Sequence, residues 1–118
     1  MNHDFNQVMK NRVRRIEEIM GTKAKEYAAH EDRYHNFNLA AQVCGCTPEK
    51  ALWGMAMKHL VSVIDLKEWT EVSPERITAH LVDEKIGDLI NYLILLEGML
   101  YKRIVETAIK EPIPCASI

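Results

Sequence analysis

Residues 47–75 have the sequence TPEKALWGMAMKHLVSVIDLKEWTEVSPE, and this stretch contains two helix starts. Each start places a serine or threonine before Pro-Glu. The hydroxyl can cap a helix, proline is tolerated in the first turn because its missing N–H has no intrahelical partner there, and an acid suits the positive helix end. The pattern predicts helices over 48–68 and 74–108, followed by a proline-containing tail over 111–118.

The rest of the chain is also predicted to be helical. From Phe5 onward, apolar residues recur at three- and four-residue spacing, which predicts a helix over 5–29 with a weak point at Gly21. A short helix is predicted over 37–44, and no alternating run with turn residues predicts a strand. We therefore expect one all-α domain over 1–118, built as a helix bundle.

The composition narrows the class of protein. Fifteen basic and seventeen acidic side chains give a formal charge of −2, so the positive surplus of a nucleic-acid binder is missing and nucleic acid is an unlikely partner. Three cysteines, an odd number, argue against a disulfide framework and suit a reducing compartment. No apolar run reaches the roughly 18 to 20 residues of a membrane span. The expected location is the cytoplasm.

Two polar stripes of the same spacing lie on the two late helices. Apolar side chains cover almost the whole circumference of both helices, which is typical of buried helices. Each stripe has the spacing i, i+4, i+7, so we expect it to face a cavity or the other stripe rather than open water. The stripes consist of Lys58, Ser62 and Asp65 on the first helix, and of Glu84, Asp88 and Asn91 on the second.

The acid pair Glu84 and Asp88 is the strongest chemical signal. Two interior carboxylates one turn apart repel each other and are costly to desolvate, and a divalent cation relieves both problems. Oxygen ligands favour Mg²⁺ or Mn²⁺. Lys58 would then provide positive charge for a phosphate, with Asn91 as a hydrogen-bond donor beside it. In the alternative interpretation, the two acids lie on a solvated seam and pair with Lys58 or Lys85.

The segment 25–37 combines charges, two histidines and three aromatic residues, as functional loops often do. Glu26, and less readily Glu31 or Asp32, could complete a metal site with the acid pair. The residues predicted to contact a base are Tyr27, Tyr34 and His35. In the alternative interpretation, this segment is a capping loop with solvated charges and aromatic residues in the core.

Residues 84–93, EKIGDLINYL, resemble the second metal motif of the MazG-like, all-α nucleotide pyrophosphohydrolase superfamily, which has the form E-E-x-G-D-x-x-x-Y. The order Lys-Glu-Tyr, Asn-Phe, a lysine-bearing helix and then Glu…Asp…Asn-Tyr is similar to small phage and prophage proteins of the nucleotide-modification-associated type. For a phage protein, the location would be the cytoplasm of the bacterial host.

This resemblance implies a four- to five-helix bundle that forms homo-oligomers, dimers or tetramers. Such proteins hold Mg²⁺ through acids on two antiparallel helices and cleave a nucleoside triphosphate to a monophosphate and pyrophosphate. Glu84 and Asp88 match the motif, whereas Lys85 replaces its second acid. The family's first motif, E-E-x-x-E, is absent, so Glu26 or Asp65 is expected to provide the missing carboxylate.

The leading hypothesis is thus a metal-dependent nucleotide phosphohydrolase or nucleotide-binding protein. The alternative is a non-catalytic helical adaptor module in which the stripes form interhelical ion pairs, Lys58 with Glu84 and Asp65 with Lys85 or His80. A DNA-binding regulator ranks last, because its basic run over residues 10–15 lies beside two glutamates.

Overall fold

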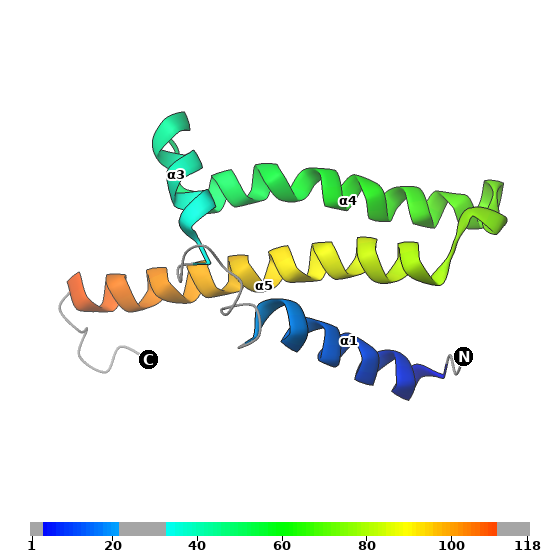
Figure 1. The fold of residues 1–118 in the computed structure, drawn as a ribbon. Helices are drawn as coiled ribbons and strands as arrows, with labels where there is room; N and C mark the ends of the chain where they lie inside the picture. The colour runs from blue at the N-terminus through cyan, green and yellow to red at the C-terminus, as the bar shows by residue number, and fades with distance from the viewer. Residues whose placement is uncertain (1–3, 22–32, 111–118) are drawn as a thin grey trace, which may run out of the picture.

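A computed structural model of the protein describes residues 4–21 and 33–110, and over these residues it is entirely helical (Figure 1). The all-α class is therefore confirmed for the described part of the chain. Glu26, Tyr27, the predicted helix beyond residue 21 up to 29 and the predicted tail lie outside the described residues. The elements are α1 (Phe5–Met20), α3 (His35–Cys44), α4 (Pro48–Val72), the 3₁₀ helix η1 (Pro74–Arg76) and α5 (Ala79–Lys110).

Local capping explains where these helices begin and end. The Thr47 hydroxyl accepts a hydrogen bond from the Lys50 N–H at 3.2 Å at the start of α4. Gly45, with φ of 66°, ends α3 in the left-handed conformation that glycine adopts without strain. α5 begins five residues after the predicted start at 74, because Pro74 opens the separate turn η1 and Thr78 caps α5 through the Leu81 N–H at 3.2 Å.

The two long helices α4 and α5 form an antiparallel hairpin (Figure 1). α3 packs against α4, whereas α1 contacts α5 and lies on the side of α5 away from α4. The buried core joins α3, the start of α4 and the second half of α5, through Phe37, Leu52 and Met99, and the rings and aliphatic chains packed against it are Tyr34, Tyr92, Leu95 and Leu96. One end of the hairpin is therefore better packed than the other.

Burial of α4 and α5 around their whole circumference, which the sequence predicts, is wrong for the single chain. Trp53 and Val61 on α4, and Leu93 and Leu100 on α5, are each about half exposed or more. The physical reason is that a helix in a hairpin has one neighbour along most of its length, so only one face can be covered. None of the described helices has the length and apolarity that crossing a bilayer requires.

Candidate functional site

The two acids of the predicted metal site lie one turn apart on α5, and each contacts a histidine. Glu84 Oε2 is 3.1 Å from His80 Nε2, and its Oε1 is 3.3 Å from Lys85 Nζ. Asp88 Oδ2 is 3.5 Å from His59 Nδ1, which comes from α4. The other oxygen of Asp88 has no partner among the described residues. Both side chains are about 40% exposed, so this face is accessible from solvent.

His59 connects Asp88 to the core. Its side chain is largely buried, and its ring lies 4.7 Å from that of Tyr92 between centroids. Tyr92 in turn makes an edge-to-face contact with Phe37 at 5.9 Å. The sequence suggests a core role for this histidine, but its contact with Asp88 depends on the register of α4 against α5. No local signal in the sequence reveals that register.

Asn91 provides the most unusual atom on this face. It lies three residues after Asp88, its side chain is only 9% exposed, and its Oδ1 has no hydrogen-bond partner in the described structure. Leaving a buried polar atom unpaired costs about 1–3 kcal/mol, so such atoms are rare without a ligand or water. The spacing of Glu84, Asp88 and Asn91 puts all three on one face of α5, as the sequence predicts.

Arg12 of α1 lies beside this face, and no pattern in the sequence assigns it to the site. Its guanidinium donates to the backbone oxygen of Asp83 at 3.2 Å and to Oδ1 of the same residue at 3.1 Å. Its Nη1 also lies 2.5 Å from the position that a Cβ atom on Gly87 would occupy. The glycine beside Asp88 therefore allows an arginine to lie directly on the helix. The only signal in the sequence is the basic run of α1, which has no visible link to α5.

The stripe on α4 does not join the acids of α5. Ser62 and Asp65 line a separate groove of about 230 Å³ together with Trp69 and Lys85, and the three polar residues of the α5 stripe do not line it. Lys58 is exposed, and it forms no ion pair with Glu84, whose partners come from α5 itself. The structure thus brings together the α5 stripe and leaves Lys58 and Asp65 outside it.

Tyr34 and His35, two predicted base contacts, lie at the start of α3 and near the other end of the hairpin. The Tyr34 hydroxyl packs directly against Gly98 of α5. Gly98 is ten residues beyond Asp88, which is about 15 Å along a helix. The described residues therefore do not bring Tyr34 to the acid pair.

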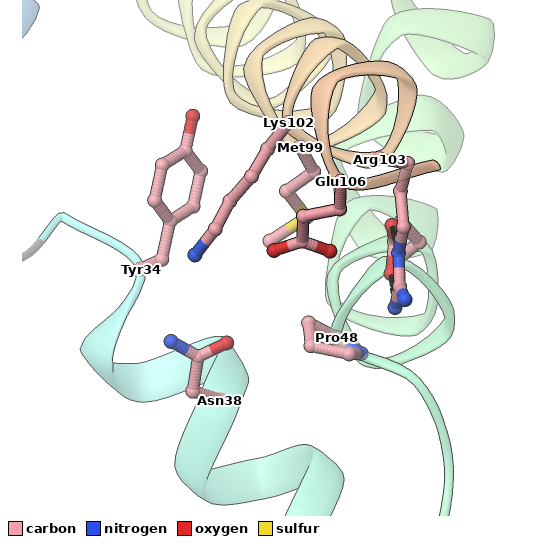
Figure 2. Close-up of a pocket in the computed structure, with 8 residues that line it drawn as sticks. Tyr34, Asn38, Pro48, Met99, Lys102, Arg103 and Glu106 are labelled. Carbon is pink, nitrogen blue, oxygen red and sulfur yellow. Dashed lines mark hydrogen bonds and ion pairs between the residues drawn. The ribbon is translucent and has the colours of Figure 1, made fainter. Parts of the chain in front are cut away.

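Tyr34 lines a cavity of about 180 Å³ between α3, α4 and α5, shown in Figure 2. A two-pronged ion pair closes one side, with Arg103 donating to the Glu49 carboxylate at 2.7 and 2.9 Å. The hydrogen bond from Arg103 lowers the pKa of Glu49 below its usual value, and the same bond raises the pKa of Arg103. Because Glu49 and Arg103 already pair with each other, this cavity is better explained as part of the packing between the helices.

Within the described ranges, no three or more histidine, cysteine, aspartate or glutamate side chains gather in a way that could hold a metal ion. Comparison with protein-family models, with curated proteins and with solved structures gave no match for this chain. We therefore infer the function from the chemistry of the α5 face itself.

Proposed function

We propose that this chain is a metal-dependent nucleotide-binding protein or nucleotide phosphohydrolase of MazG-like type, similar to small phage or prophage proteins. One observation carries the proposal: among the described residues, one carboxylate oxygen of Asp88 and the buried amide oxygen of Asn91, one turn away on the same face of α5, have no partner. Both free atoms are hydrogen-bond acceptors. They suit a hard cation or a sugar hydroxyl, whereas the amide nitrogen of Asn91 would serve a phosphate oxygen.

The donor set on α5 fits Mg²⁺ or Mn²⁺. The atoms by which Glu84, Asp88 and Asn91 would hold a cation are all oxygens, and cation binding would displace Lys85 Nζ from Glu84. When bound, the cation supplies positive charge for a polyphosphate and Lewis-acid activation of water. Asp65 lies in a different groove, so Glu26, outside the described residues, is the stronger candidate for a third carboxylate.

The proposed reaction is hydrolysis of a nucleoside triphosphate between its α and β phosphorus atoms. The water oxygen bonds to the α phosphorus, the bridging oxygen leaves with pyrophosphate, and the proton passes to solvent. In this scheme His59 positions Asp88, since it lies 3.5 Å from the carboxylate and its ring is held against Tyr92. Asn91 would bind the substrate, and Tyr27, which lies outside the described residues, stays a predicted base contact, whereas Tyr34 and His35 lie near the other end of the hairpin.

Self-association into a dimer or tetramer is part of the proposal. The single chain leaves large apolar side chains exposed on both long helices, and pairing two hairpins would produce a four-helix bundle that covers them. Light scattering should give a multiple of the 13.6 kDa chain mass. A monomer at every concentration tested would contradict the proposed assembly.

Thermal melting with and without millimolar Mg²⁺ or Mn²⁺ tests the metal site. A cation that binds only the native state raises the melting temperature, and the gain corresponds to about 2.7 kcal/mol at one hundred times the dissociation constant. Asp88→Asn should abolish the rise. Glu97→Gln, an exposed substitution on the same helix, should keep it. An equal rise in both variants would contradict a site at Asp88.

A non-catalytic adaptor is the second candidate, favoured by the exposed apolar residues of α1, among them Phe5, Met9 and Val13. The interhelical pair between Lys58 and Glu84 that this hypothesis invoked does not form, because Glu84 pairs with residues of α5. A stable adaptor would melt at the same temperature with and without divalent cations, which separates it from the first candidate.

A further inference from the structure

A large groove between α1 and the first turn of α5 is lined by three arginines. It has a volume of about 640 Å³, within the usual range for small-molecule sites. Arg12, Arg14 and Arg15 line it from α1, and among the described residues that line it Asp83 is the one acid. Three arginines against one aspartate leave a formal excess of two positive charges, although the whole chain carries −2.

The arginines are held in place by carboxylates that satisfy only part of their donor capacity. Arg12 Nη2 and Arg15 Nε converge on the two oxygens of Asp83, at 3.1 and 3.3 Å. Arg15 also donates to Glu18 at 2.8 Å, and this hydrogen bond is the main reason why the pKa of Arg15 is raised. Each guanidinium has five N–H donors, so a preorganised arginine pair still has donors to offer to an anion.

The start of α5 adds positive potential to the same groove. Ala79 and His80, the first residues of this 32-residue helix, line the groove beside the arginines. The N–H groups of Leu81 and Val82 already bond to Thr78, whereas those of Ala79 and His80 have no partner among the described residues. Free N–H groups and the helix dipole both favour an anion at this position.

The groove also has an apolar wall, and it borders the acids of α5. Val8, Ile77 and Val82 form this wall. A ligand with a phosphate and a ring would contact the arginines through its phosphate and the apolar wall through its ring. His80 of the groove contacts Glu84, and Arg12 lies on Gly87 next to Asp88. The cationic groove and the proposed cation ligands therefore form adjoining parts of one surface.

We propose that this groove binds the phosphates of a nucleoside phosphate, with Arg12 and Arg15 as phosphate ligands and the apolar wall beside the base or sugar. The choice of a nucleoside phosphate as the ligand rests on the proposed function. The groove adds a phosphate subsite on α1, an element that no motif in the sequence connects with the acids.

The test is calorimetric titration of the full chain with ATP and with inorganic triphosphate, in EDTA so that no divalent cation contributes. ATP should bind, and more tightly than triphosphate because only ATP can use the apolar wall. Arg12→Gln and Arg15→Gln should each weaken binding about tenfold, the usual loss for a charge-assisted hydrogen bond. Arg76→Gln, which removes an arginine stacked on Trp69 outside the groove, should leave binding unchanged.

Arg14→Glu keeps the inference testable if the Arg12 and Arg15 variants fail to fold. Arg14 is 62% exposed and, within the described part of the chain, pairs only with Glu18, so the fold depends little on it. A reversed charge at the rim should still weaken ATP binding several-fold. The inference is overturned if the wild type binds neither probe, if the groove variants bind like the wild type, or if duplex DNA displaces ATP at equal phosphate concentration.

Turnover separates the two proposals. Metal-free ATP binding that needs Arg12, without pyrophosphate release under any metal condition, would support the groove and contradict the hydrolase. Pyrophosphate release that needs Asp88 but survives Arg12→Gln with unchanged KM would support the hydrolase and contradict the groove.

Discussion

Along α5, the side that faces α3 and α4 packs rings and aliphatic chains, whereas the side that faces α1 carries arginine side chains laid over a glycine. At the first seam, Leu52 and Met99 are almost fully buried and Tyr92 packs against His59. At the second seam, Arg12 and Arg15 of α1 meet at Asp83 of α5. The first seam is packed like a hydrophobic core, whereas the second presents arginine side chains suited to binding an anion.

This difference separates the packing that stabilises the fold from the proposed phosphate groove, while the acid face of α5 contacts α4 through Asp88 and His59. Substitutions at the α4 seam should change unfolding free energy, and those at the α1 seam should change ligand binding with little cost in stability. Five substitutions test that division.

The largest effect is expected for Leu52→Ala. Leu52 is 1% exposed and lies in the core cluster, so truncation should lower the unfolding free energy by about 2–5 kcal/mol. Val8→Ala, at the α1 seam, should cost less than about 1 kcal/mol because half of that side chain is exposed. Urea unfolding measures both. Equal losses would remove the distinction between the seams.

Gly98→Ala should be the next most damaging change. The added methyl group would collide with the Tyr34 hydroxyl, whose ring packs against the core. Overpacking of this kind costs about 1–3 kcal/mol, and the better helix propensity of alanine offsets up to about 1 kcal/mol of it. A melting temperature above that of the wild type would show that Tyr34 moves freely.

Glu49→Gln tests the ion pair that joins α4 to α5. Arg103 lowers the pKa of Glu49 in the folded state, so the pair stabilises the fold above the unfolded pKa of about 4.3, and this contribution disappears as pH falls through the folded value. The variant should be about 1 kcal/mol less stable at pH 7, and the difference should shrink as pH falls through the lowered pKa of Glu49. A difference that persists at low pH would exclude this electrostatic explanation.

The smallest change in stability is expected for Gly87→Ala, and its sign should be the opposite of that for Gly98→Ala. The added methyl group meets only the flexible end of Arg12, so the helix propensity of alanine should stabilise the fold by up to about 1 kcal/mol. The displaced guanidinium should, however, weaken ATP binding in the groove. Unchanged ATP affinity would separate Arg12 from the ligand site.

The sequence predicts the helical class and the common face of Glu84, Asp88 and Asn91, because both follow from periodicity along one helix. It could not predict that Lys58 and Asp65 lie apart from that face. Their position depends on the register of α4 against α5, which is set by core contacts such as those of Leu52. The sequence could not predict the partners of the site for the same reason. His59 contacts Asp88 across the hairpin, and Arg12 contacts Gly87, which lies 75 residues further along the chain.

Pyrophosphate release from a panel of canonical and modified nucleoside triphosphates, with Mg²⁺ or Mn²⁺, tests the central claim most directly. The α5 face predicts release by the wild type and by Glu97→Gln, and its loss in Asp88→Asn without loss of helicity. Release that is unchanged in Asp88→Asn would contradict a site built on this carboxylate. No release across the panel, together with melting that does not respond to either cation, would contradict the assignment as a metal-dependent nucleotide protein.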